Sequence, residues 1–218
     1  MKETMKYNER IDKILSSSGI MTRREAKRAA LCGRISLDGV TVKSVDTRIT
    51  QDNTLTLDGK LINYKKYIYI MMDKPEGYVC STDEPGEKSV LELLHEPYSK
   101  MTLFPAGRLD KNTTGFVLLT NDGVSAHNLL SPGKHVVKKY IYTLASPVSP
   151  EALANMENGC VLEDGYITKK CTITALNDYS GYITLTEGKY HQIKRMFLAA
   201  GSKVTSLRRI CYNGIEID

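Results

Sequence analysis

The sequence has 218 residues, of which 41% are hydrophobic and 25% are charged, with a formal net charge of +5. This composition is that of an ordinary globular protein and excludes a mainly disordered chain. No apolar run approaches the roughly 20 residues needed to span a bilayer, and the N-terminus lacks the apolar core of a signal peptide, so we expect a cytoplasmic protein.

The five cysteines are odd in number, scattered, and without a C-x-x-C pair. This pattern predicts neither a disulfide framework nor a zinc site, so we expect no bound metal. Free cysteines usually behave as small apolar side chains, and we expect these five to be reduced and mostly buried.

The positive charge is concentrated in the first third of the chain. Residues 1–66 contain 14 Lys and Arg against 8 Asp and Glu, a net +6, and residues 67–218 contain 16 against 17, a net −1. A local basic surface is what phosphate binding requires, because neutralised phosphates release condensed counterions. A solvated surface with a chance surplus explains the charge alone equally well.

Two short helices are predicted first. Apolar residues at helical spacing indicate a helix over residues 8–18, and Gly19 ends it. Thr22 and Glu25 form a capping-box pattern that begins a second helix, which Gly33 closes. This second helix has a small-residue face of alanines and, opposite to it, a dense cluster of cations: Arg23, Arg24, Lys27 and Arg28. Such crowding favours an anionic partner.

A hairpin follows the helices. Residues 35–37 and 40–42 read as strands on either side of Asp38-Gly39, a pair that tolerates the positive φ of a primed turn. Residues 50–66 show no clear run, and we expect them to complete a small domain and link it to the next.

The unit RIDKILSSSGIMTRREAKRAALCGRISLDGVTV resembles an S4 RNA-binding domain over about Arg10 to Val45. Thr22 stands where that family usually has serine, and Asp38 where it mostly has asparagine; neither change alters the cap or the turn. The resemblance implies RNA binding by the first domain, and the contacts we expect there are Arg10, Arg23, Arg24, Lys27, Arg28 and Arg34.

Strands and helices alternate irregularly in the remainder of the chain. We expect strands at residues 67–72, 115–120, 136–144, 171–176 and 182–186, and helices at residues 89–94, 124–130, 150–158 and 191–200. The pattern predicts an α+β domain built on a largely antiparallel sheet. We therefore divide the chain into an S4-like domain with its linker, residues 1–62, and a catalytic domain, residues 63–218.

The most informative motif is AGRLDKNTTGFVLLTNDG, residues 106–123. It places Arg108 and Asp110 in a polar loop before an apolar strand, where a rigid element can position a carboxylate. An isolated loop aspartate is more often a turn former. The whole string, however, resembles the G-R-L-D signature of pseudouridine synthases, with Phe116 in place of the common leucine.

Three further segments carry the same resemblance. They are KPEGYVCSTD (residues 74–83), KKY (138–140) and EGKYHQIKRMF (187–197). The first and last are similar to the RsuA-type branch, which modifies small-subunit ribosomal RNA. The resemblance spans about Arg10 to Arg209. Related proteins often continue with a short segment beyond the position of Asp218, and the sequence leaves open whether a C-terminal element is missing.

The resemblance implies an isomerase that converts uridine to pseudouridine in 16S ribosomal RNA, at a site of the uridine-516 type. The reaction breaks the N1–C1′ bond, rotates the uracil and rejoins it through C5, so no atom enters or leaves and no cofactor is expected. It needs a carboxylate that adds to the sugar or takes its 2′ proton, and we assign this role to Asp110 with both routes open.

Two further catalytic residues follow from the family motifs. A carboxylate in a partly dry pocket must stay ionised, and a nearby cation favours its ionised form. The family motif gives Lys194 as this cation and Arg195 as the alternative. The competing interpretation is that Lys194 is only a surface lysine on a helix. A flipped-out base needs an aromatic face, and Tyr140 fits this role unless it is simply a sheet tyrosine.

Further RNA contacts are expected around this site. Lysine, histidine and arginine crowd the start of the last predicted helix, where the helix dipole is already positive, so an anion should compensate them. Arg108 is expected to contact the RNA backbone or to fill the gap left by the flipped base. The expected contacts in this domain are Lys74, Arg108, Lys138, Lys189, His191, Gln192 and Arg195.

Three other functions are compatible with parts of this pattern. A non-catalytic S4 adaptor would bind ribosomal RNA only, but it would gain nothing from an aspartate that faces phosphate. A hydrolase could use Asp110 and Glu187 as a carboxylate pair and release free base. A synthase acting on large-subunit (23S) ribosomal RNA is also compatible, because the GYVCSTD motif disfavours it only moderately. We expect ribosomal RNA as the partner and a monomeric chain, although the sequence leaves the target uridine and the oligomeric state open.

Overall fold

A computed structural model describes residues 7–131, 133 and 136–217. The chain divides into two compact units, Met1–Ile68 with Leu91–Leu103 and Tyr69–Val90 with Phe104–Asp218. The boundary that the motifs place after residue 62 stays a prediction. No helix in the described part of the chain is long and apolar enough to cross a membrane.

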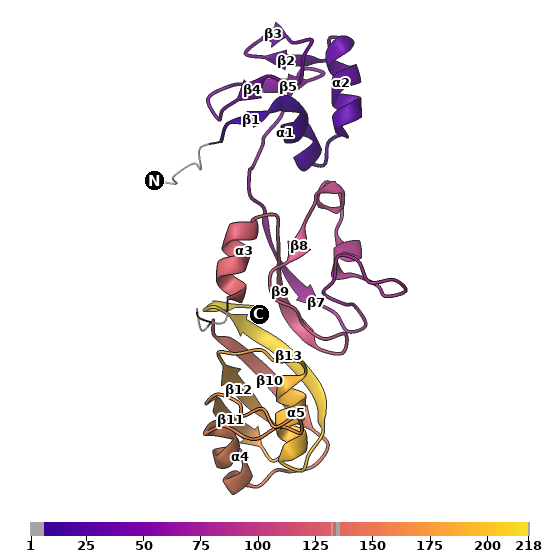
Figure 1. The fold of residues 1–218 in the computed structure, drawn as a ribbon. Helices are drawn as coiled ribbons and strands as arrows, with labels where there is room; N and C mark the ends of the chain where they lie inside the picture. The colour runs from indigo at the N-terminus through magenta and orange to yellow at the C-terminus, as the bar shows by residue number, and fades with distance from the viewer. Residues whose placement is uncertain (1–6, 132, 134–135, 218) are drawn as a thin grey trace. The chain divides into compact units, whose positions relative to one another are not determined.

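The first unit contains two helices and short strands (Figure 1). In chain order these are β1 (Glu9–Arg10), α1 (Ile11–Ser17), α2 (Arg23–Leu31), β2 (Ile35–Leu37), β3 (Val40–Thr41), β4 (Arg48–Ile49), β5 (Leu55–Leu57) and β6 (Lys60–Leu61). The first helix begins later than predicted, because residues 9 and 10 pair with β4 as a strand. The predicted capping box at the start of α2 is confirmed, since Thr22 and Glu25 each accept the other's backbone N–H.

Two hairpins of the same kind build the sheet of this unit, which has the order β3-β2-β5-β6. Asp38 and Gly39 turn with φ of 49° and 82°, as the sequence predicts. Asp58 and Gly59 repeat this turn with φ of 50° and 76°. Residues 50–66 therefore contain the hairpin β5–β6, which the sequence analysis did not predict.

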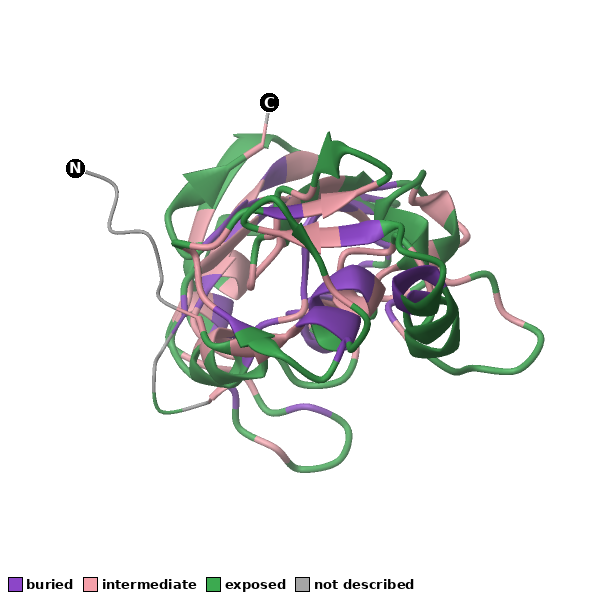
Figure 2. Ribbon diagram, turned by 90° about the horizontal axis from the view of Figure 1, so that it is seen from above, coloured by how far each residue is buried: buried purple, intermediate pink, exposed green. Residues whose placement is uncertain are grey.

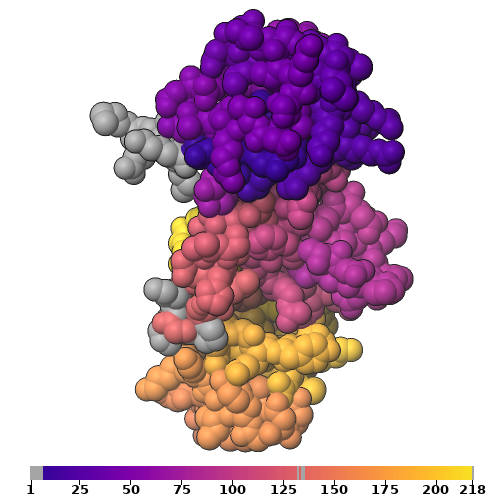
Figure 3. All heavy atoms as spheres, turned by 45° about the horizontal axis from the view of Figure 1, so that its top comes forward, coloured from indigo at the N-terminus to yellow at the C-terminus, as the bar shows by residue number. Residues whose placement is uncertain are grey.

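The core of the first unit lies between the helices and the sheet. Ile11, Ile14 and Leu15 of α1 are fully buried, together with the alanine face of α2. Figure 2 colours the ribbon by burial, and the helices carry both buried residues in purple and exposed residues in green. In the space-filling view, residues 7–62 form a closely packed body coloured indigo to purple (Figure 3). Alanine on the inner face lets α2 approach closely while its cations stay in water.

The second unit is built on one mixed sheet. Its elements are β7 (Tyr69–Lys74), β8 (Phe104–Pro105), β9 (Thr114–Thr120), α3 (Gly123–Leu130), β10 (Lys138–Leu144), α4 (Pro150–Glu157), β11 (Thr172–Asn177), β12 (Ser180–Leu185), α5 (Gln192–Ala199), β13 (Val204–Tyr212) and β14 (Ile215–Glu216). The strand order is β11-β12-β10-β13-β9-β7, with β8 on β9 and β14 on β13. Within the described residues only β9 and β13 pair in parallel, so the prediction of a largely antiparallel sheet in an α+β fold is confirmed.

Strand β13 is the longest element that the sequence analysis missed. It lies in the middle of the sheet, between β10 and β9, and carries Arg208 and Arg209 at its centre. Two adjacent arginines argue against a buried strand, yet Arg209 is only 1% exposed because its guanidinium donates to main-chain carbonyls. Gly115 allows the close pairing with β9, since a Cβ there would lie 2.2 Å from the Arg209 carbonyl oxygen.

Helix α5 packs on the sheet beside β10 and β13 (Figure 1). Its Phe197 ring lies 4.5 Å from the ring of Tyr142 on β10, measured between centroids. This contact fixes the helix, so that its first turn lies at the edge of a cavity. The predicted helix over residues 89–94 is instead a single 3-10 turn, η1 (Val90–Leu93), followed by another, η2 (Tyr98–Lys100).

The cysteines are free thiols, as expected. They are less buried than predicted, because only Cys80 and Cys211 are buried, while Cys32 is exposed. Burial raises the pKa of the Cys80 thiol and raises that of Cys171 to about 12, so both stay protonated at neutral pH. Neither thiol is suited to act as a nucleophile.

Candidate active site

A cavity of about 590 Å³ opens beside the loop between β8 and β9. Its wall comes from that loop, from the strands β10 and β13, and from the loop and first turn of α5. Residues that are far apart in the sequence, Asp110, Tyr140 and Lys194, meet in this one wall. All three catalytic candidates therefore face a common space.

The loop that carries Asp110 is held at both ends. On one side, Arg209 donates to the carbonyl oxygens of Phe116 at 2.8 Å and Gly107 at 3.4 Å. On the other, Lys74 donates to the carbonyl oxygen of Lys111 at 3.1 Å. A loop fixed in this way can present a carboxylate in one position without reorganisation.

Lys74 has a structural role in this site. Its side chain is fully buried, and its ammonium also donates to the carbonyl oxygens of Pro75 and Tyr78, at 2.9 and 2.8 Å. Burial lowers the pKa of Lys74. Lys74 thus ties the first motif to the loop that carries Asp110, and its contact with RNA stays a prediction.

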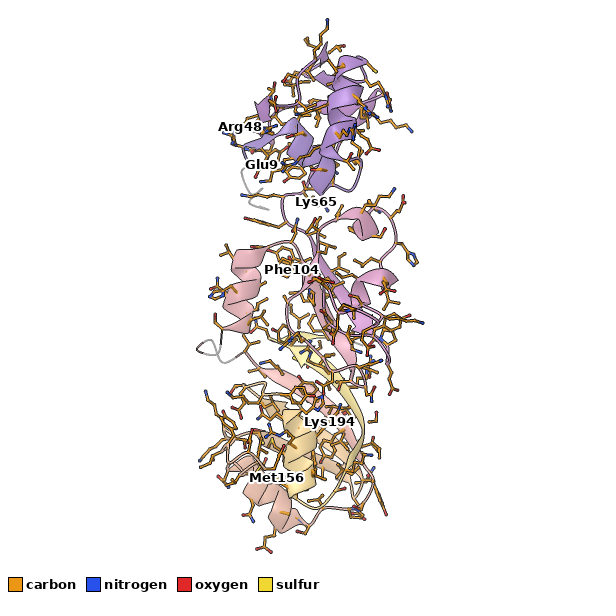
Figure 4. All side chains as sticks on the ribbon, turned by 45° about the vertical axis from the view of Figure 1, so that its right-hand side comes forward. Glu9, Arg48, Lys65, Phe104, Met156 and Lys194 are labelled. Carbon is orange, nitrogen blue, oxygen red and sulfur yellow. The ribbon has the colours of Figure 1, made fainter. Side chains whose placement is uncertain are left out.

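Asp110 forms an ion pair with Lys194. The Lys194 Nζ lies 3.0 Å from Asp110 Oδ2, and the two side chains are 27% and 30% exposed. The His191 Nε2 lies 3.6 Å from the same oxygen. Lys194, labelled in Figure 4, belongs to the first turn of α5. The carboxylate is thus flanked by two basic side chains and is still accessible from the cavity.

Arg195, the alternative partner of Asp110, is engaged elsewhere. It pairs with Glu163 and Asp164, with both N–O distances at 2.6 Å. Lys194 lines the cavity, whereas Arg195 is not part of its wall. The structure thus brings Lys194 and not Arg195 to the carboxylate.

Tyr140 is a buried residue of β10 that lines the cavity. It pairs across the sheet with Ile183 on β12 and Arg209 on β13, so the backbone that carries its ring is rigid. An aromatic ring in the wall of a cavity that also contains a carboxylate suits a flat base. The position is compatible with the stacking role expected for Tyr140.

Glu187 braces the loop before α5. Its carboxylate accepts hydrogen bonds from the Tyr166 hydroxyl at 2.8 Å, the Lys169 N–H at 2.8 Å and the Gln192 side-chain amide at 2.5 Å. Both carboxylate oxygens are engaged, which leaves Glu187 poorly suited to the hydrolytic pair with Asp110. Gln192 is 4% exposed, belongs to this brace and lines the cavity, and its contact with RNA stays a prediction.

The remaining expected contacts in this unit surround the cavity. Lys138 and Lys189 line it, and burial, followed by the charge of Arg209, lowers the pKa of Lys138. The Lys189 ammonium lies 4.7 Å from the centre of the Tyr166 ring. Arg108 is exposed and also lines a second hollow of about 260 Å³ beside Cys80.

Three functional candidates were missed by the sequence analysis. Arg209 shapes the loop of Asp110, and no sequence pattern set it apart from its neighbour Arg208. Thr113 and Tyr212 line the cavity, and their buried hydroxyls have no hydrogen-bond partner among the described residues. Such groups usually have a partner, so the wall retains hydrogen-bonding capacity. No sequence pattern indicated these two residues.

The cations of the first unit fall into two groups. Arg10 pairs with Asp12 and Asp46, and Arg34 pairs with Asp58, so internal acids neutralise these two charges. In contrast, the four cations of α2 are exposed, and none of them forms an ion pair within the described residues: Arg23, Arg24, Lys27 and Arg28. Helix α2 is therefore the candidate phosphate-binding surface.

The cavity wall brings together a loop carboxylate, the lysine that pairs with it and a buried tyrosine, which is an arrangement suited to carboxylate-dependent catalysis. The N-terminal unit adds a helix surface whose cations form no ion pair within the described residues. A family model described as RNA pseudouridylate synthase matches residues 68–199, and one for the S4 domain matches residues 9–55. The chain belongs to the RNA pseudouridylate synthase family and is a pseudouridine synthase, an isomerase, with an N-terminal S4 domain.

Relatives cover almost the whole chain. An uncharacterised RNA pseudouridine synthase of Bacillus subtilis is 41% identical over 96% of this chain and 90% of its own length. Ribosomal small subunit pseudouridine synthase A of Salmonella typhimurium is 37% identical over 96% of this chain and 91% of its own length. A crystal structure of a pseudouridylate synthase superposes with a TM-score of 0.66, at 36% identity, and covers 96% of this chain and 90% of its own.

Proposed function

We propose that this protein converts one uridine of 16S ribosomal RNA into pseudouridine, at a site of the uridine-516 type. The observation that carries the mechanism is the Asp110–Lys194 pair, 3.0 Å apart in the cavity wall. The choice of small-subunit RNA is supported by the relatives named ribosomal small subunit pseudouridine synthase A, which the chain matches over 96% of its length. We place the activity in the cytoplasm, where ribosomal RNA is available.

In this proposal Asp110 starts the reaction. Its carboxylate either adds to C1′ as the N1–C1′ bond breaks, or removes the 2′ proton so that the base leaves. The released uracil turns and forms a bond from C5 to C1′. In the first route this step breaks the bond between Asp110 and C1′, and in the second route Asp110 returns the proton to C2′. The C5 proton is then lost and N1 gains a proton, so that atoms and electrons balance without an added reactant.

The other residues hold the components in place. Lys194 keeps the carboxylate charged and oriented, and Tyr140 stacks on the uracil while it is detached. Because no atom is exchanged and no oxidation state changes, the proposal includes neither a cofactor nor a metal. A single chain suffices, because every residue assigned to catalysis belongs to one unit of one chain.

RNA is held first by charge. Helix α2 binds phosphates through its unpaired arginines and lysine. The basic side chains around the cavity guide the target strand toward Asp110: Arg108, Lys138, Lys189 and His191. Phosphate contacts give affinity and register, whereas the cavity selects the base.

The test is to map pseudouridine in ribosomal RNA from cells with and without this protein. The proposal predicts that one 16S position loses its modification and regains it when the wild-type chain is restored. Loss at a 23S position would reassign the substrate to the large subunit. An unchanged map would refute the proposal.

A further inference from the structure

Tyr190 is an aromatic side chain with an unusual degree of exposure. It is 77% exposed, the highest value among the large hydrophobic side chains that the structure shows as exposed in its described residues. Single exposed apolar residues are common and need no explanation by themselves. The contacts of the Tyr190 ring and its position beside the cavity, however, indicate a function.

The ring of Tyr190 is oriented by a stack. It lies on the imidazole of His191 with ring centroids 3.9 Å apart and planes inclined by 19°. His191 is itself placed by the active site, since its Nε2 lies 3.6 Å from Asp110 Oδ2. The Tyr190 carbonyl also accepts a hydrogen bond from Arg195 at 3.4 Å. The tyrosine ring is therefore linked to the catalytic carboxylate through one intervening ring.

The position of Tyr190 is just outside the cavity. Lys189 and His191, on either side of it in the chain, both line the cavity, whereas Tyr190 does not. His191 has a left-handed backbone with φ of 50°, which turns the chain between the exposed tyrosine and the start of α5. A base stacked on Tyr190 would lie beside the entrance, where a nucleotide next to the flipped uridine must pass.

We propose that the Tyr190–His191 stack is a platform for the nucleobase directly next to the target uridine in the RNA chain. The inference rests on the proposed function, because it takes the target uridine to occupy the cavity of Asp110. A base and an aromatic ring stack irrespective of base identity, so the platform recognises a nucleotide without reading its sequence. The cation of Lys189 beside it suits the phosphate that joins the two nucleotides.

The platform acts on binding and positioning, not on bond breaking. By holding the neighbouring base outside the cavity, it fixes the backbone on one side of the uridine and favours the flipped state. Loss of the ring should therefore weaken RNA binding by about tenfold. The reaction rate at saturating RNA should stay within about threefold, because Asp110, Lys194 and Tyr140 remain.

The test combines side-chain and base deletions. The probe is a labelled nine-nucleotide RNA with one central uridine, together with versions that carry an abasic residue directly 5′ or 3′ of it. Binding is measured by fluorescence anisotropy for wild type, Tyr190→Ala, Tyr190→Phe and Tyr179→Ala. Tyr179 is the matched control, a 49% exposed tyrosine between β11 and β12.

The platform predicts a coupled result. The wild-type protein should bind one of the two abasic RNAs about tenfold more weakly than the intact RNA. Tyr190→Ala should bind the intact RNA about tenfold more weakly than the wild-type protein does. Removing the same base should not weaken its binding further. Tyr190→Phe and Tyr179→Ala should behave as wild type. Full affinity of Tyr190→Ala, or an abasic penalty that persists in this variant, overturns the inference, as does a wild-type protein that does not bind the probe.

The binding assay requires no pseudouridine formation, which separates the two proposals. A chain that shows the coupling but modifies no ribosomal RNA refutes the proposed function and retains the platform. A chain that modifies 16S RNA without the coupling does the reverse.

Discussion

The ion pair between Asp110 and Lys194 leads to a quantitative prediction. Replacing Lys194 by Met keeps an unbranched side chain on α5 and removes only the ammonium that lies 3.0 Å from the carboxylate. His191 remains at 3.6 Å, but it is charged only when protonated. Asp110 therefore loses its permanent counter-charge and its main orienting hydrogen bond.

The size of this loss follows from Coulomb's law. At 3.0 Å, two unit charges attract by about 1.4 kcal/mol in bulk water and by about 5.5 kcal/mol at an effective dielectric constant of roughly 20. The side chains are 27% and 30% exposed, so water screens part of this attraction. A loss of about 2 kcal/mol in transition-state stabilisation lies within these limits and corresponds to a roughly 30-fold slower reaction.

The assay is single-turnover pseudouridine formation at saturating RNA, with RNA affinity measured separately. Lys194→Arg is the control, because it restores a permanent cation at the same position, and it should keep most of the wild-type rate. A Lys194→Met rate within about threefold of wild type would refute the reasoning. So would a Lys194→Arg variant as slow as Lys194→Met, since charge would then not be the cause.

Three other predictions test the remaining parts of the account. Replacing the three arginines of α2 by alanine should weaken RNA binding. It should also reduce the slope of log affinity against log salt by about 0.7 to 0.9 per lost phosphate contact. An unchanged slope in a salt series would contradict the assignment of α2 as the phosphate-binding surface. Gly115→Ala should destabilise the protein by at least about 2 kcal/mol in denaturant unfolding, because its Cβ would meet the Arg209 carbonyl at a φ of 99°, whereas Gly123→Ala, with open space around it, should not. Burial tends to raise the pKa of Asp122, but hydrogen bonds from Ser125 and Tyr69 bring it below its usual value. The ionised Asp122 therefore stabilises the folded protein fully above the pKa that Asp122 has in the unfolded chain, and this contribution is lost as the pH falls through its pKa in the folded protein. Asp122→Asn should make the free energy of unfolding depend less steeply on pH in the acid range. An identical acid profile would exclude this role.

Local patterns predicted the local structure well. The capping box of Thr22 and Glu25 and the Asp38-Gly39 turn both depend on neighbouring residues, and both are present. The turn at Asp58-Gly59 carries the same signal, between strands of three and two residues, and the sequence analysis did not use it. Asn213-Gly214, with φ of 53° and 78° between β13 and β14, is a third example.

Contacts between residues far apart in the sequence were predicted only where a family motif indicated them, and the others were not predicted. The approach of Lys194 to Asp110, 84 residues away, was expected from a motif match and from no local pattern. Lys74 and Arg209 look like surface cations in the sequence, yet both are buried. Their partners are main-chain carbonyls, which every residue possesses, so no residue type could reveal them.

The central claim is that the Asp110 carboxylate performs the isomerisation, and Asp110→Asn tests it most directly. The substitution keeps the shape of the side chain and removes its charge, while Asp73→Asn, at an exposed aspartate paired with Arg208, serves as the control. Single-turnover pseudouridine formation and RNA affinity should be measured for both variants. We predict no detectable pseudouridine with Asp110→Asn at nearly unchanged affinity, and near wild-type turnover with Asp73→Asn. An Asp110→Asn rate within about tenfold of wild type, a loss of only about 1.4 kcal/mol, would contradict the account.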